Sequence, residues 1–155
     1  MLSYQTLDKT ESGITGIMVR FMDTLKARDF QTHARLQEQD LKPQFFAFRW
    51  LTLMLSQEFA LPDVLRIWDS LLSDETRCDL LIEVCVAMIM LVREKVMVQE
   101  FPENMKLLQV RRLSYPLASP CCCRCRHIYN FQNYPFTDVG IILTAATKAL
   151  DGKGS

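Results

Sequence analysis

Four cysteines near the C-terminal end of this 155-residue chain are the residues whose type and spacing could do chemistry: Cys121, Cys122, Cys123 and Cys125. Cys122 and Cys125 form a Cys-x-x-Cys pair, and His127 follows closely. A structural zinc site takes four ligands, normally from two separated pairs, and the sequence has no second pair. We therefore expect no metal site. The same thiols, set among arginines, are typical of reversible palmitoylation, and an unstructured, oxidisable stretch would have the same composition.

No other part of the chain carries a signature of catalysis. The sequence has no glycine-rich phosphate loop, no serine elbow and only five glycines from which to build such sites. His33 has no nearby cysteine or second histidine, so we interpret it as a surface or half-buried side chain. The sequence thus argues against a self-contained enzyme and calls for no cofactor.

The charges of the chain balance overall but are unevenly distributed. Eighteen basic and eighteen acidic residues give a formal net charge of zero, which argues against nucleic acid or anionic lipid as a target of the whole chain. Between Glu103 and Asp138 there is no acidic residue, and five basic ones occur: Lys106, Arg111, Arg112, Arg124 and Arg126. Any electrostatic role, such as peripheral attachment to a membrane, would belong to this segment.

The apolar runs are too short for a membrane protein. The longest, Val84 to Val92, has nine residues, whereas roughly 20 are needed to cross a bilayer. Residues 1–13 show no secretion signal. We expect a cytoplasmic protein, with peripheral contact to endomembranes as a further expectation.

Apolar periodicity predicts helices along most of the chain. The pattern from Ile14 to Leu25 is that of an amphipathic helix. Asp29 can cap a second helix, which ends before Pro43. Pro43 opens a third helix that reaches about Leu55 and is apolar almost all round, so we expect it to be central. Further helices are expected over residues 62–72, from 77 to about 98 and from a Thr137 cap to about 152, and a short segment lies around 104–109. Since no strand-like alternation occurs, we predict an all-α fold of stacked helices.

The periodicity fails between residues 110 and 133. This stretch combines prolines, four cysteines and arginines without a sustained repeat, which indicates a loop, an insert or a disordered segment. We therefore divide the chain into a helical unit over 13–109, an irregular Cys/Arg-rich insert over 110–133, expected to be disordered, and a terminal helix over 134–151.

Two predicted helices each present an arginine and a tryptophan among apolar residues. Arg49 and Trp50 occur in KPQFFAFRWL at 42–51, followed by SQEF at 56–59, and Arg66 and Trp68 occur in LRIWD at 65–69. One interpretation packs both tryptophans between helices and pairs Arg66 with Asp69 one turn away. The alternative is a direct role in binding a ligand.

These motifs resemble the C-terminal half of the TBC domain, the all-helical domain of Rab GTPase-activating proteins. The resemblance runs from Gly13 to Gln109 and resumes over Tyr134 to Val139. It identifies Arg49, Trp50, Arg66, Trp68 and Asp69 as family-motif residues with a structural role. It also implies a Rab-type small GTPase as partner and no cofactor.

The resemblance implies a mechanism whose residues are missing here. TBC domains insert an arginine finger and a glutamine finger into the Rab active site, where they stabilise charge and orient the attacking water. These fingers belong to Ile-x-x-Asp-x-x-Arg and Tyr-x-Gln motifs in the N-terminal half. The segment from Ile14 to Arg20 has the first spacing but lacks the aspartate, and Tyr4-Gln5 has the wrong spacing for the second. We therefore assign no catalytic residue.

The expected function is that of a Rab GTPase-activating protein of the TBC type, present as a C-terminal fragment that is inactive alone. It is an enzyme regulator rather than an enzyme. The alternative is a noncatalytic helical module that binds a small GTPase or another protein.

Overall fold

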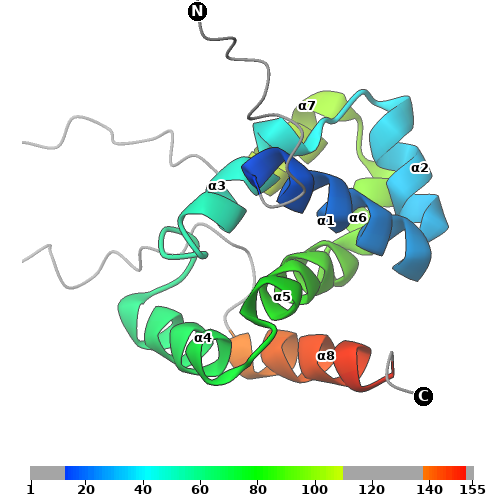
Figure 1. Cartoon of the computed structure of the whole chain (residues 1–155). Helices are drawn as coiled ribbons and strands as arrows, with labels where there is room; N and C mark the ends of the chain where they lie inside the picture. Colours follow the sequence, from blue (N-terminus) through cyan, green and yellow to red (C-terminus); the bar gives the residue numbers. More distant parts are fainter. Residues whose placement is uncertain (1–12, 110–137, 153–155) are drawn as a thin grey trace, which may run out of the picture.

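A computed structural model of the chain describes residues 13–109 and 138–152, and every regular element in these ranges is helical. The predicted all-α class is confirmed. Figure 1 shows the helices in chain order. Their bounds are α1 Ile14–Arg28, α2 Phe30–Glu38, the 3₁₀ helix η2 Pro43–Phe45, α3 Ala47–Thr52, α4 Leu61–Ser73, α5 Arg77–Leu91, α6 Arg93–Val98, α7 Phe101–Gln109 and α8 Val139–Asp151.

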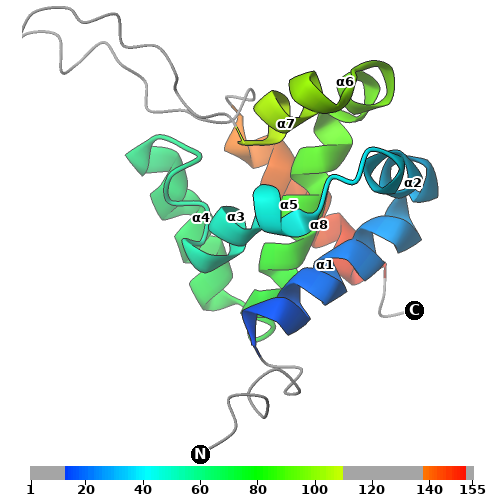
Figure 2. The ribbon, with the colours of Figure 1, turned by 90° about the horizontal axis from the view of Figure 1, so that it is seen from above.

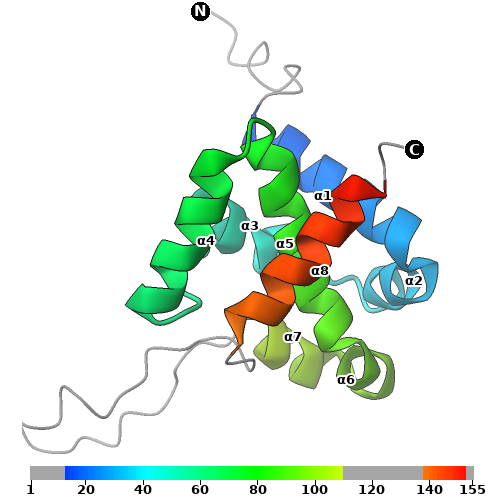
Figure 3. The same ribbon diagram turned by 90° about the horizontal axis from the view of Figure 1, so that it is seen from below.

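Helix α5 is the centre of the fold. All residues from Leu80 to Ile89 are buried, because α1, α3, α4 and α8 all pack against this helix. Figures 2 and 3 show α5 running between α4 on one side and α1 on the other, with α8 crossing it. A helix without a polar face is stable only when other elements surround it, and α5 meets that condition.

The expectation that residues 43–55 form the central helix is wrong. The segment forms η2, the six-residue α3 and a turn in which Met54 and Leu55 have φ values of 47° and 62°. The left-handed conformation ends a helix, and here the Leu55 N–H donates to the Trp50 carbonyl across the turn. The segment is also only half buried, because Phe45 and Phe48 are each 46% exposed.

The helix predicted from residue 77 to about 98 is interrupted. Val92 separates α5 from α6, and its N–H bonds to the carbonyls of Ile89 and Met90. Val92 is itself 1% exposed, so the change of direction occurs inside the core. Apolar periodicity continues across the break because both helices bury apolar side chains, which is why the pattern alone does not show it.

Helix α8 is capped at its start and is joined to α1 near its end. Asp138, rather than the predicted Thr137, is its N-cap, and the Asp138 side chain accepts a hydrogen bond from the Gly140 N–H. Near the other end, Arg28 of α1 donates to the Ala149 carbonyl and also pairs with Glu83 of α5 at 3.2 Å. Glu83 is 2% exposed. One guanidinium therefore connects α1, α5 and α8.

Asp29 connects the start of α2 to α6. Its side chain accepts hydrogen bonds from the Gln31 and Thr32 N–H groups, as an N-cap does, and from the Arg93 guanidinium. Burial acts to raise the pKa of Asp29, but the hydrogen bonds from Thr32 and Arg93 outweigh it and lower the pKa. The N-cap predicted from sequence is confirmed, and it also carries an ion pair.

We expect Asp29→Ala to lower the free energy of unfolding by about 2 kcal/mol, the upper range for a lost N-cap, because α2 loses its cap and Arg93 its partner. Urea unfolding followed by circular dichroism measures this change. Asp23→Ala, an exposed acid on α1, is the control and should change stability by less than about 0.5 kcal/mol. Because the folded-state pKa of Asp29 is lowered, its contribution should be lost as the pH falls through that pKa. Equal effects of both variants would contradict the role of Asp29.

Candidate functional site

The family-motif residue Arg49 forms an ion pair with an acid that lies inside the protein. Arg49 Nε donates to Glu58 Oε1 at 2.6 Å. The Glu58 side chain is 2% exposed and that of Arg49 is 28% exposed. A carboxylate in this position requires a partner, since a buried unpaired charge costs several kcal/mol. Arg49 on α3 therefore stabilises the turn that carries Glu58.

The chemistry of Glu58 is set by burial and by two donors. Burial raises the pKa of Glu58, and hydrogen bonds from Arg49 and Trp50, together with the positive charge of Arg49, limit that rise. Cys85 of α5 is also affected, because its own burial and the charge of Glu58 raise the pKa of the Cys85 thiol. A protonated, buried thiol is a poor nucleophile. The arrangement holds a charge in place rather than presenting it to a substrate.

Trp50 belongs to an aromatic cluster that is centred on Phe46. It is completely buried, and its ring packs edge-on against Phe46 at a centroid distance of 5.5 Å. Phe46 in turn packs against Phe21 of α1 at 6.2 Å. Such edge-to-face pairs add roughly 0.5–1.5 kcal/mol beyond the burial of apolar area. Trp50 packs between helices, as the sequence predicts.

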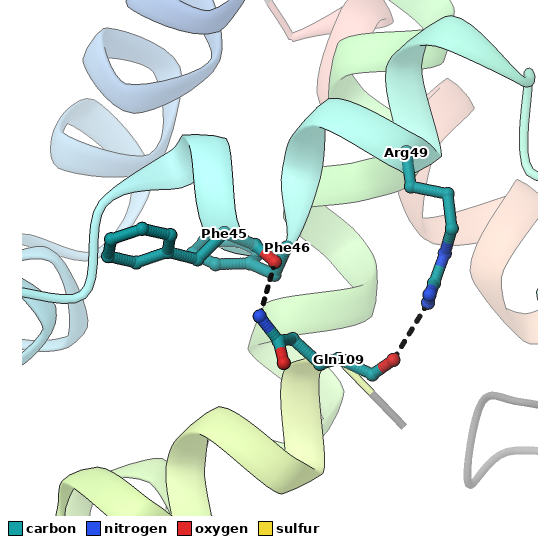
Figure 4. A pocket seen from close by; sticks show the side chains of 4 residues that line it. All are labelled: Phe45, Phe46, Arg49 and Gln109. Carbon is teal, nitrogen blue, oxygen red and sulfur yellow. Dashed lines mark hydrogen bonds between the residues drawn. The ribbon is translucent and has the colours of Figure 1, made fainter. Parts of the chain in front are cut away.

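Gln109, at the end of α7, forms hydrogen bonds with both η2 and α3. Its side-chain amide donates to the Phe45 carbonyl at 2.7 Å, and its own carbonyl accepts from Arg49 Nη2 at 2.8 Å. Figure 4 shows both bonds at the edge of a pocket lined by Phe45, Phe46, Arg49 and Gln109. The pocket has a volume of about 310 Å³. Neither a nucleophile nor a general base lines it.

The second tryptophan, Trp68 of α4, fixes the turn after α3. Its Nε1–H donates to the carbonyl of Met54 at 2.9 Å, and Met54 and Leu55 are the two residues of this turn with positive φ. A left-handed conformation at a non-glycine residue is unfavourable by about 1–2 kcal/mol and needs such support from its surroundings. Trp68 is half-buried against the core and makes a hydrogen bond that the sequence pattern did not show.

The predicted ion pair between Arg66 and Asp69 is absent. Both residues are exposed on α4, and the described part of the chain offers neither of them an ion pair within 4.0 Å. Arg66 is turned toward α8 instead, with Nη2 3.7 Å from the place where a Cβ on Gly140 would lie. The roles of the five family-motif residues in function stay predictions.

The remaining predicted site residues lie outside the described ranges. These are the lipidation candidates Cys121, Cys122, Cys123 and Cys125, together with His127. The division of the chain at residues 109 and 134 also stays a prediction. Within the described ranges, no group of acidic, histidine and cysteine side chains could hold a metal ion, and no helix is long and apolar enough to span a membrane.

Sequence reasoning missed Glu58 and Gln109 as partners of Arg49. Glu58 follows the polar residues Ser56 and Gln57 and precedes apolar ones, so the sequence gives only a weak signal that this acid is buried and needs a nearby arginine. Gln109 gives no such signal. Its contribution depends on the path of α7, which places a carbonyl from far along the chain beside α3.

We expect Arg49→Met to destabilise the protein by about 3 kcal/mol at neutral pH, because it leaves Glu58 buried without its cation. The pKa of Glu58 in the folded variant should rise further above its ordinary value of 4.5. A raised folded-state pKa means that stability falls as the pH rises through that pKa. Urea unfolding at a series of pH values should therefore show a small difference from wild type at acidic pH and a growing one above.

The double variant Arg49→Met, Glu58→Gln is the control for this effect. Compared with Glu58→Gln alone, the double variant should show a difference that does not depend on pH, because neither protein has an ionisable group at position 58. A penalty for Arg49→Met that is independent of pH would show that Arg49 acts by packing alone.

Comparison of the sequence with known proteins finds a matching family and two similar relatives. The profile of the Rab-GTPase-TBC domain family matches residues 2–97. TBC1 domain family member 13 of Homo sapiens is 53% identical over 149 residues, which cover 96% of this chain and 32% of that protein. The Mus musculus protein of the same name is 52% identical over the same shares. The chain thus spans about a third of the length of these relatives.

A solved structure shows the same fold. The crystal structure of the Ypt/Rab-GAP domain of Gyp1p matches with a TM-score of 0.68 and 20% sequence identity. The match covers 93% of this chain and 38% of that chain. The helical arrangement around α5 is therefore that of part of a TBC domain. With the family profile and the similarity to its relatives, these findings show that the chain belongs to the Rab-GTPase-TBC domain family.

Proposed function

We propose that this chain acts as the C-terminal helical part of a GTPase-activating protein for Rab-type small GTPases, and that its 155 residues do not activate GTP hydrolysis alone. Membership of the TBC family supports the first part. The second part is supported by the sequence, which contains neither Ile-x-x-Asp-x-x-Arg nor Tyr-x-Gln. Without a cation and an amide placed at the reacting phosphate, the transition state gains no stabilisation.

The contacts of Arg20 support this proposal. Arg20 is the arginine with a finger-like spacing, but its guanidinium pairs with Asp79 of α5. An arginine finger must extend from its own domain into the active site of the GTPase. Arg20 instead pairs with an acid of its own chain, where α1 packs against α5.

We also propose a cytoplasmic location with peripheral contact to endomembranes. The support is the cluster Cys121, Cys122, Cys123 and Cys125 beside basic residues, because thioester lipids and positive charge together bind a membrane stably. Metabolic labelling with a palmitate analogue should modify this cluster. Labelling that leaves the four cysteines unmodified would remove the support for membrane contact.

The purified chain should leave GTP hydrolysis by a panel of Rab proteins at its intrinsic rate. An arginine finger contributes roughly 10³–10⁵-fold, so single-turnover assays separate the outcomes clearly. Rab-specific acceleration that is lost in Arg20→Ala but kept in Lys26→Ala, on the same helix, would contradict the proposal. Binding to a GTP-loaded Rab without acceleration would favour the alternative, a noncatalytic binding module, for which the exposed Phe45 and Phe48 offer contact area.

A further inference from the structure

Helix α4 carries a second apolar face that the described protein leaves uncovered. Its inward face is buried against α5, but Leu61, Leu65 and Leu72 are 69%, 50% and 63% exposed. With the half-buried Trp68 between them, these residues follow one another at intervals of four, three and four. That spacing is typical of the seam along which one helix packs against another.

The turn after α3 lies against this face, because Trp68 donates a hydrogen bond to the Met54 carbonyl. Figures 1 and 3 show α4 at the margin of the molecule, with α5 and α8 on its inner side. We call Leu61, Leu65, Trp68 and Leu72 the α4 outer face. Exposed apolar side chains that follow one another along a helix are typical of an interaction site.

The length of the related fold identifies what would cover this face. The chain matches the Gyp1p domain over 93% of its own length but only 38% of that domain. More than half of the solved TBC domain therefore lies outside the part that this chain resembles. That larger part must contact the matched part along some surface, and in this chain α4 presents a row of exposed leucines at the spacing of a helix contact.

We propose that the α4 outer face binds a helix from the portion of a TBC domain that this chain does not resemble. The inference rests on the proposed function, because it completes the same GTPase-activating domain. The occupant is an amphipathic helix whose apolar stripe packs between Leu61, Leu65 and Leu72. Trp68 lies within this contact and becomes fully buried, whereas Trp50, already completely buried in the core, keeps its surroundings.

The test uses the full chain and human TBC1 domain family member 13 from which the segment similar to this chain has been deleted. The two polypeptides are co-expressed, and light scattering after size-exclusion chromatography should show a one-to-one complex. In a chain labelled with 5-fluorotryptophan, the two tryptophans give two ¹⁹F resonances, assigned with Trp68→Phe. The Trp68 resonance should move on binding and that of Trp50 should not.

Variants locate the contact on α4. Leu65→Glu with Leu72→Glu should weaken binding at least tenfold, and Leu72→Glu alone, at an exposed position that tolerates charge, should give a smaller loss in the same direction. Phe30→Glu on α2 is the matched control, since Phe30 is 64% exposed and Leu72 63%. It should leave the affinity unchanged.

Three results would overturn the inference. These are the absence of a complex, a complex whose affinity the α4 variants leave unchanged, and a homodimer of this chain that the α4 variants abolish. The proposed function fails in a different way. A complex that needs the α4 outer face but does not accelerate GTP hydrolysis by any Rab would leave the docking intact and contradict the assignment as part of a GTPase activator.

Discussion

The burial of α5 on all sides is the constraint on which the rest of the structure depends. A helix whose residues 80–89 are all removed from water must be enclosed by several neighbours, and no single amphipathic helix could cover it. Helices α1, α3, α4 and α8 each bury one apolar stripe against it. The buried Glu83 adds a polar requirement, which Arg28 meets while it also contacts α8. Packing and charge thus impose the same arrangement.

Arginine contacts with the carbonyls at helix ends recur through the fold. Arg28 donates to a carbonyl in the last turn of α8, and Arg49 donates to the carbonyl of the final residue of α7. Arg35 donates to the Gln99 carbonyl, immediately after α6. The last carbonyls of a helix lack partners within it and carry partial negative charge, so a guanidinium satisfies both needs. The family-motif Arg49 is one instance of a feature that assembles short helices into a unit.

Local sequence predicted the helices well where a single apolar stripe or a cap determined them. The pattern from Ile14 to Leu25 and the cap at Asp29 both correspond to what the structure shows. Local sequence did not predict the backbone conformation where contacts between distant residues determine it. Met54 and Leu55 are an example, because Trp68 from the next helix supports their positive φ. The same reason explains why one part of the site could be predicted from the sequence and another could not. Burial of Trp50 followed from its apolar surroundings, but the Gln109 contact joins residues that no periodicity relates.

The contact between Arg28 and Ala149 also affects how the chain tolerates change in length. These residues are 121 positions apart in sequence, so closing the loop between them has already incurred most of its entropic cost. That cost grows only with the logarithm of loop length, and doubling the loop adds about 0.6 kcal/mol. The contact of α1 with α8 is therefore compatible with a wide range of chain lengths between Arg28 and Ala149, each at a similar cost in stability.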